Sequence, residues 1–195
     1  MAVDTLVVGL GNPGKEYART RHNVGEEAVA EVARRAGESM RLGRDKAMVA
    51  QCTVAGHQVV LAFPTTYMNE SGQAVGALLR RHGLTDPALL PGVLIVVHDE
   101  LDLPPATVRV KVGGGLAGNN GLRSITAHLH TQDYVRVRIG IGKPSSKEHG
   151  ANHVLSKFSK ADREQMDVAI QEAADAVELL LAEGPDAAQR RFNTR

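Results

Sequence analysis

The apolar residues of this chain follow two patterns, and each pattern predicts one kind of strand. Short runs that are wholly apolar are typical of strands buried on both faces of a parallel sheet, whereas alternation of apolar and polar residues is typical of strands with one polar face. Strands are predicted at 6–10, 48–54, 59–63, 93–97, 108–112 and 135–141. The turn Ala55-Gly56-His57 joins the second and third of these into a hairpin.

Apolar residues about 3.6 positions apart predict amphipathic helices between and after these strands. The first helix is expected over 24–35, and the last begins after residue 159 and carries apolar residues up to 181. The helices that begin with a polar cap have their predicted caps at Ser71, at Asn119 or Asn120, and at Ser159 with Asp162. The tail that contains Arg190 and Arg191 is expected to fray.

Alternation of strands and helices predicts the α/β class. We expect a three-layer sandwich in which a mixed, mostly parallel sheet is flanked by helices. The chain of 195 residues has no internal repeat and is most simply one domain over 1–195.

Composition narrows the classes of partner. The formal net charge is +1, so contact with a nucleic acid would need a local basic patch, and three Tyr, three Phe and no Trp argue against a surface that stacks many bases. Cys52 is the one cysteine, which excludes an internal disulfide and fits a reducing compartment. No signal peptide or membrane-length apolar run is present, so we expect a cytoplasmic protein that does not use a membrane.

Gly9, Gly11 and Gly14 spell G-x-G-x-x-G directly after the first predicted strand. A dinucleotide site requires a helix that opens at the third glycine and an acid that ends the next strand about 20 residues on. Polar residues follow Gly14 instead, and the next helical pattern starts only near Asn23. The motif alone is weak evidence for nucleotide binding, and a tight turn at the end of a strand would use the same glycines.

Polar side chains follow the ends of several predicted strands. Asn12 and His22 come after the first strand, Asn69 after the hairpin, and Asp99 after the run at 93–97, while Asn120 ends a glycine-rich loop at 113–121. In open α/β sheets, ligands bind beyond the carboxyl ends of the strands, so we expect these loops to meet in one crevice.

One imidazole, one carboxylate and several carboxamides, without a plausible nucleophilic Ser or Cys, suggest activation of water. His22 would be the general base, because its ordinary pKa lies near neutrality, and Asp99 would fix its tautomer. The alternatives are a solvated histidine and turn-forming asparagines. The acids at 98–102 could also ligate a hard metal or form a solvated loop.

Four cations lie on the polar faces of two predicted strands. Arg109 and Lys111 alternate with valines in one, and Arg136 and Arg138 alternate with apolar residues in the other. These faces could be merely solvated, but they also suit phosphates.

Taken together, these segments resemble bacterial peptidyl-tRNA hydrolases. The matching stretches are 7–25, 65–75, 96–104, 110–125 and 135–144. The resemblance implies hydrolysis of the ester that joins a peptide to the 3′ end of tRNA, by a monomer without metal or organic cofactor.

The resemblance also implies a role for individual residues. It makes His22 the catalytic base and Asp99 its partner. The residues that would position water and ester are Asn12, Asn69 and Asn120. Tyr17 and Met68 would line the crevice, and Lys111 and Arg138 would bind tRNA phosphates. The glycine-rich loop would gate or line the peptide channel.

Three positions depart from the family's usual pattern. Asn119 stands where a histidine is usual, Glu26 where an aromatic or apolar residue is common, and Phe63 where a lysine is common. None of them removes the proposed base or its carboxylate. A non-catalytic RNA-binding protein on the same fold is the alternative function, since fold does not determine function.

Overall fold

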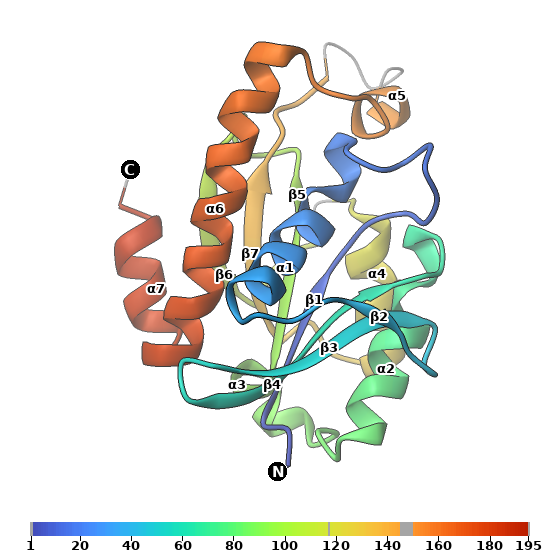
Figure 1. Cartoon of the computed structure of the whole chain (residues 1–195), viewed down its shortest axis with the longest axis vertical. Coiled ribbons are helices and arrows are strands. Elements are labelled where there is room, and N and C mark those ends of the chain that lie inside the picture. The colour runs from blue at the N-terminus through green and yellow to red at the C-terminus, as the bar shows by residue number, and fades with distance from the viewer. Residues whose placement is uncertain (1, 117, 145–149, 195) are drawn as a thin grey trace.

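The computed structural model describes residues 2–116, 118–144 and 150–194. Within them lies a seven-stranded sheet in the order β2-β3-β4-β1-β5-β7-β6 (Figure 1). The strands are β1 (Thr5–Gly9), β2 (Arg41–Leu42), β3 (Ala47–Val54), β4 (His57–Pro64), β5 (Leu94–Glu100), β6 (Val108–Val112) and β7 (Val135–Gly140). The central strands β4, β1, β5 and β7 are parallel, and β2, β3 and β6 pair antiparallel at the two sides. The predicted hairpin is therefore confirmed as β3–β4.

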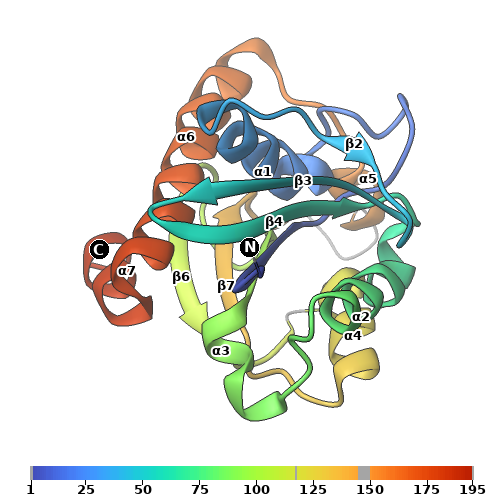
Figure 2. The same cartoon turned by 60° about the horizontal axis from the view of Figure 1, so that its bottom comes forward.

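Helices cover both faces of this sheet. The α-helices are α1 (Val24–Arg35), α2 (Ser71–Arg81), α3 (Leu90–Val93), α4 (Asn120–Leu129), α5 (Gly150–Val154), α6 (Lys160–Glu183) and α7 (Pro185–Phe192), and the 3-10 turns are η1 (Arg21–Asn23), η2 (Met68–Glu70) and η3 (Pro87–Leu89). Helices α1, α6 and α7 pack on one face, and α2, α3 and α4 on the other (Figure 2). The predicted three-layer α/β sandwich is confirmed.

The core explains why β1 is apolar from Leu6 to Val8. Val7 packs with α1 and α6, while its neighbours Leu6 and Val8 pack with α2 and α4. Since both faces of β1 are covered, polar residues have no solvated side of this strand to occupy. All five of its residues are buried.

Two glycines let α1 approach the sheet closely at the end that carries the site. A Cβ on Gly9 would collide with the carbonyl oxygen of Gly25, and a Cβ on Gly25 would collide with the carbonyl oxygen of Val97. Turn residues, not a helix, follow Gly14, so the structural context of a dinucleotide fingerprint is missing. Gly9 and Gly25 allow the first turn of α1 to lie against β1 and β5.

The structure corrects three local predictions. The strand expected at 93–97 continues to Glu100, because Asp99 pairs with Ile139 and Glu100 with Gly140 on β7. Ser71 is the first residue of α2 and not its cap, since its hydroxyl donates to the carbonyl oxygen of Met68.

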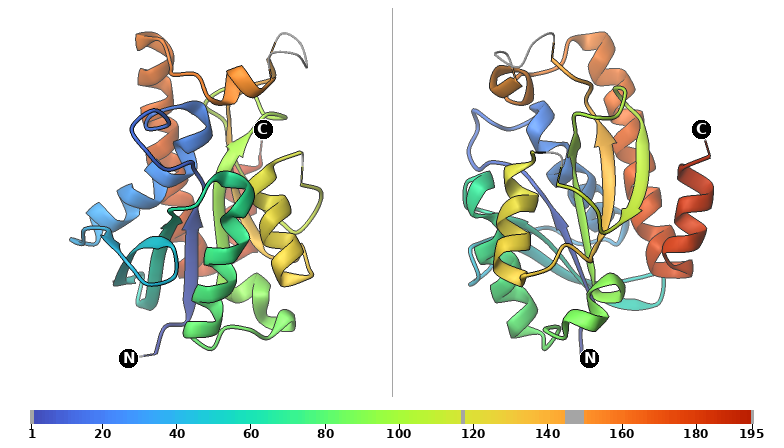
Figure 3. Two further views of the ribbon diagram at one scale, coloured as in Figure 1. Left: turned by 90° about the vertical axis from the view of Figure 1, so that its right-hand side faces the viewer. Right: turned by 180° about the vertical axis from the view of Figure 1, so that it is seen from behind.

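The tail at 190–191 is helical instead of frayed, and it lies beside the outer strand β6 (Figure 3). The side-chain amide of Asn193 accepts from the backbone N–H of Val110 at 2.9 Å and donates to its carbonyl oxygen at 2.7 Å. The tail thereby satisfies backbone groups of an edge strand that would otherwise have no neighbouring strand.

Other predicted features have mixed outcomes. The cap of α6 is confirmed, because Ser159 Oγ accepts from the backbone N–H of Asp162 at 3.2 Å. The polar loop predicted at 143–153 lies partly outside the described residues, and its described end contains α5. Cys52 is free and buried. In the described ranges, no helix is long and apolar enough to span a membrane.

Candidate active site

A cavity of about 260 Å³ lies beyond the carboxyl end of β5. Its walls come from η1, from the last residues of β5, from the N-terminus of α4 and from α5. His22, Asp99, Asn119 and Asn120 are among its lining residues. Segments that are far apart in the sequence, such as those of His22 and Val154, thus meet where open α/β folds bind their ligands.

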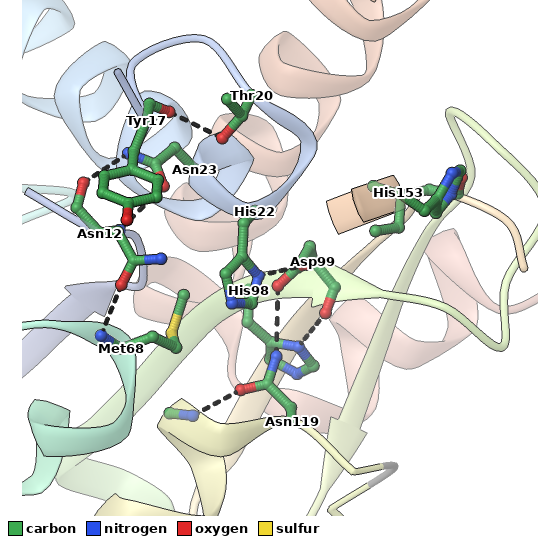
Figure 4. A network of polar contacts seen from close by, with 12 residues as sticks. Asn12, Tyr17, Thr20, His22, Asn23, Met68, His98, Asp99, Asn119 and His153 are labelled. Atoms are coloured by element: carbon green, nitrogen blue, oxygen red, sulfur yellow. Dashed lines mark hydrogen bonds and ion pairs between the residues drawn. The ribbon is translucent and has the colours of Figure 1, made fainter. Parts of the chain in front are cut away.

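His22 and Asp99 form a close pair in this cavity (Figure 4). His22 Nδ1 lies 2.8 Å from Asp99 Oδ2, and the two side chains are 12% and 3% exposed. The carboxylate accepts a hydrogen bond from the N–H group at Nδ1, so the lone pair of the neutral ring is on Nε2. The geometry is that of a histidine base with an orienting acid.

The pKa of His22 reflects two opposing effects. Burial by itself lowers the pKa of the imidazole, but the negative charge of Asp99 and its hydrogen bond outweigh burial. The net result is a pKa above the ordinary value of histidine. The ring therefore takes up a proton more readily than a free histidine does.

Asn119 supports Asp99 from the other side and caps α4 as well. Its Nδ2 donates to Asp99 Oδ1 at 3.2 Å, and its Oδ1 accepts from the backbone N–H groups of Gly121 at 2.9 Å and Leu122 at 3.1 Å. Because those N–H groups can bond only to an oxygen, they determine which end of the amide faces Asp99. Asn119, not Asn120, is the helix cap.

Asn12 is held by bonds that leave its side chain directed into the site. Its backbone N–H donates to Asn23 Oδ1 at 2.8 Å, and Asn23 Nδ2 donates to its carbonyl oxygen at 2.9 Å. Its Oδ1 accepts from the backbone N–H of Met68 at 2.6 Å. In Figure 4, the amide nitrogen of Asn12 faces His22.

Of the remaining predicted crevice residues, Asn120 lines the cavity, whereas Tyr17, Met68 and Asn69 do not. The ring of Tyr17 meets that of Tyr67 edge to face, with centroids 6.3 Å apart. Met68 is buried, and its sulfur lies where a side chain on Gly121 would be. Asn69 is exposed in η2, next to Met68, and Asn120 is the exposed first residue of α4.

Glu26 lies behind the paired asparagines. Its carboxylate and the side chain of Asn23 occupy the space that a Cβ on Gly11 would need. Burial first, and then the charge of Glu27, raise the pKa of Glu26 to about 7. This departure from the family pattern places a second group that titrates near neutrality close to the site.

The predicted basic face is not uniform. Arg136 is 2% exposed, and its guanidinium donates to the carbonyl oxygens of Gly113 at 3.0 Å and Gly115 at 2.8 Å, so it anchors the glycine-rich loop and is not a phosphate ligand. Arg138 Nε donates to Glu100 Oε1 at 3.0 Å. Lys111 is half-buried against Gly114.

The acids at 98–102 do not form a metal site. Successive residues of a strand point to opposite faces, so His98 and Asp99 diverge. His98 is fully buried, and burial lowers its pKa to about 4. Among the residues that the structure describes, no group of three or more His, Cys, Asp or Glu could hold a metal ion.

Sequence reasoning did not single out the roles of Asn23, Asn119 and Arg136. Asn23 stands directly before the apolar stripe of α1, and its burial and its bonds to Asn12 are visible only in the structure. Asn119 is one of two predicted caps and departs from the family's usual histidine, but its bond to Asp99 is visible only in the structure. Arg136 gave no signal, because its alternation pattern is the same as that of Arg138.

Comparison with known proteins adds a family to this geometry. Residues 6–195 match the family model described as peptidyl-tRNA hydrolase. The chain is 49% identical over 189 residues to a peptidyl-tRNA hydrolase of Nocardia farcinica, covering 96% of this chain and 95% of the relative. It is 47% identical over 195 residues to one of Rhodococcus erythropolis, covering 99% and 100%.

A solved structure shares the whole fold. The crystal structure of peptidyl-tRNA hydrolase from Acinetobacter baumannii superposes with a TM-score of 0.90 at 38% identity, covering 100% of this chain and 97% of that one. The similarity therefore extends over all the elements that form the cavity.

Proposed function

The chain belongs to the peptidyl-tRNA hydrolase family, and from this premise we propose which of its residues carry out the reaction. The enzyme hydrolyses the ester between the peptide and the 3′-terminal ribose of peptidyl-tRNA, which releases peptide and free tRNA. The observation that carries the assignment of residues is the 2.8 Å contact of His22 with Asp99 in a nearly buried pair.

His22 is the general base. Its Nε2 takes a proton from a water molecule while the water oxygen attacks the ester carbonyl carbon. The tetrahedral intermediate collapses by breaking the bond between that carbon and the ribose 3′ oxygen. The imidazolium returns its proton to this leaving oxygen, so the ring ends neutral and atoms and charge balance.

Asp99 keeps His22 ready for this cycle. It holds the proton on Nδ1 and stabilises the imidazolium that forms during attack. Asn119 donates to the second carboxylate oxygen of Asp99 without adding a charge, so it orients the acid but does not titrate. In this role it takes the place of the histidine that is usual in the family.

Amide groups hold the water and the carbonyl. The side-chain nitrogen of Asn12 is a donor that can meet the developing oxyanion, and Asn69 and Asn120 position the water and the ester. Tyr17 and Met68 line the space next to them. Because neutral amides carry no net charge, the pKa of His22 is determined by burial and by Asp99.

Lys111 and Arg138 bind the tRNA phosphates. They are diagonal to each other on the antiparallel pair β6–β7, where Lys111 lies opposite Arg136 and Arg138 lies opposite Arg109. The pair with Glu100 orients Arg138 before tRNA arrives. We further propose that the enzyme is cytoplasmic and forms one domain over 1–195, in keeping with a single sheet. We also propose that it works as a monomer, and sedimentation with and without tRNA measures this oligomeric state.

The test of the base is hydrolysis of an N-acetylated aminoacyl-tRNA by the parent, His22→Ala and His57→Ala. Loss of a general base lowers kcat by about 10²- to 10⁴-fold. His57 is the matched control, since it lies at the amino end of the parallel strands, at the start of β4, whereas the cavity lies beyond the carboxyl end of β5. Parental turnover by a folded His22→Ala protein would remove His22 from the mechanism.

The same assay decides the non-catalytic alternative. A protein that only binds RNA would show salt-sensitive binding but no ester cleavage at any concentration. The intact His22–Asp99 pair and the family both favour the enzyme, and no feature of the comparisons favours the alternative.

A further inference from the structure

We propose that Arg21 is a positioning residue, which holds the His22 turn against Asp99 from the side away from the substrate. The inference rests on the proposed role of His22 as the base. It concerns how the ring is kept in place, not what the ring does.

The turn that carries His22 has little stability of its own. η1 is three residues long, and no side chain caps it. Short 3-10 turns have poor hydrogen-bond geometry, and Arg19 just before the turn adopts a positive φ of 62°. The orientation of His22 must therefore come from the groups that contact the turn.

One side of the turn is fixed by Asn23, whose side chain makes two buried bonds to the backbone of Asn12. The other side is fixed by Arg21. The backbone N–H of Arg21 donates to the carbonyl oxygen of Ser156 at 3.0 Å, and Thr20 forms an isolated β-bridge with Lys157.

The side chain of Arg21 adds three more contacts to the same segment. Its Nη1 donates to Ser156 Oγ at 2.6 Å and to the carbonyl oxygen of Lys157 at 3.0 Å. Its guanidinium carbon lies 4.6 Å from the centre of the Phe158 ring, a cation–π arrangement. The side chain is only 15% exposed, and its bond to Ser156 is partly buried, so water competes weakly with that bond.

The anchor continues to the end of a central strand. Ser156 Oγ donates to the carbonyl oxygen of His153 at 2.6 Å, and His153 Nε2 lies 3.1 Å and 3.0 Å from the carbonyl oxygens of Ile141 and Gly142. These residues directly follow β7. Arg21 thus ties the His22 turn to the rigid sheet through the segment before α6.

Arg21 does not line the His22 cavity. Its side chain, with those of Phe158 and Asp162, lines a separate cavity of about 440 Å³. It therefore acts on catalysis through His22 and not by contact with the ester. Removing its hydrogen bonds should change the alignment of His22 with Asp99 and leave binding of tRNA almost unaltered.

The test compares Arg21→Met, Arg21→Lys and Ser156→Ala with the parent, with measurement of kcat, KM, the pH–rate profile and the pKa of His22 by NMR. Methionine keeps the apolar stem but removes the donors. We expect kcat to fall by about 10- to 100-fold with little change in KM, because displacement by about 1 Å has effects of that size. The pKa of His22 and the acid limb should both move to lower pH, since poorer contact with Asp99 leaves burial dominant.

The matched control is Arg163→Met. Arg163 also lies over the Phe158 ring, at 5.6 Å, but it pairs with Glu27 and Asp167, whereas Arg21 bonds to Ser156 and Lys157. It should retain the parental kcat and acid limb. Arg21→Lys should recover part of the kcat that Arg21→Met loses. Ser156→Ala should reproduce part of that loss, and it tests the inference independently where Arg21→Met folds poorly.

Two outcomes would overturn the inference. One is a folded Arg21→Met protein with the parental kcat; the other is a lower kcat with an unchanged pKa of His22, which is what a merely structural role produces. The NMR titration separates this inference from the proposed function. If His22→Ala is inactive while Arg21→Met behaves as the parent, only the role of Arg21 fails.

Discussion

Replacing Asp99 by asparagine should move the ring proton of His22 from Nδ1 to Nε2, because Asn119 determines how the new amide is oriented. The N–H groups at the start of α4 bond to Asn119 Oδ1, so its Nδ2 must face residue 99. In Asp99→Asn, the new amide must turn its oxygen toward that donor. Its NH₂ then faces His22 Nδ1 and donates to it, which moves the ring proton to Nε2, the atom that has to accept from water.

The size of the effect follows from the two interactions that change. Turning the new amide the other way would bring two donors together, which costs about 1–3 kcal/mol. The imidazolium also loses a charged partner, worth about 4 kcal/mol for unit charges about 4 Å apart at an effective dielectric constant of about 20. These effects overlap, so we expect a loss of about 3–6 kcal/mol, or about 10²- to 10⁴-fold in kcat.

The assay is single-turnover release of tRNA from an N-acetylated aminoacyl-tRNA between about pH 5 and 8.5. Neutral His22 is the active form, so the parental rate falls as the pH drops through its raised pKa. Without the carboxylate, burial alone acts on the ring, and the acid limb of Asp99→Asn should lie at lower pH.

A second variant tests the tautomer argument itself. Asn119→Ser keeps an oxygen for the helix cap and replaces the amide donor, whose direction is fixed, by a hydroxyl that can donate to residue 99 or accept from it. In the Asp99→Asn background it frees the new amide to turn, so the double variant should be faster than Asp99→Asn alone, by about tenfold for each 1.4 kcal/mol relieved. If the double variant is slower than Asp99→Asn, the reasoning is refuted.

Three further predictions address the fold and the binding of tRNA. Gly25→Ala drives a methyl group into the backbone of Val97 and should lower the free energy of unfolding in urea by about 1–3 kcal/mol; an unchanged free energy of unfolding would contradict the close packing. The folded-state pKa of His98, about 4, lies below its unfolded value, so the free energy of unfolding should fall by about 1.4 kcal/mol per pH unit as the pH drops from about 6.5 to about 4. His98→Gln should make the free energy of unfolding less dependent on pH in this range, and the same pH dependence in the parent and the variant would argue against this role of His98. Lys111→Gln should raise KM and reduce the salt slope of binding by about one, whereas Arg138→Gln should also destabilise the fold because Glu100 is left buried without its partner; equal unfolding midpoints would refute the difference.

Most of the helices and strands could be predicted from sequence because periodicity is a local property. The stripe at 24–35 is α1, and the alternating runs are β6 and β7, since a half-covered helix or strand must place its apolar residues at its own period. Element ends were less certain, because they depend on neighbours: β5 continues through Asp99 only because β7 provides pairing partners.

The sequence by itself determined the fold class, the family and the residue types of the chemistry: an imidazole, a carboxylate and amides after strands. Only the tertiary structure decided their partners. Arg136 and Arg138 share one pattern, yet Arg136 is buried under the glycine-rich loop and Arg138 pairs with Glu100. Likewise, the orientation of Asn119 and the anchoring of Arg21 depend on segments far along the chain. The periodicity of apolar residues determines which face of a helix or strand a residue occupies. The burial of its side chain, its charge and, for a histidine, its tautomer depend on the distant groups that pack against that face.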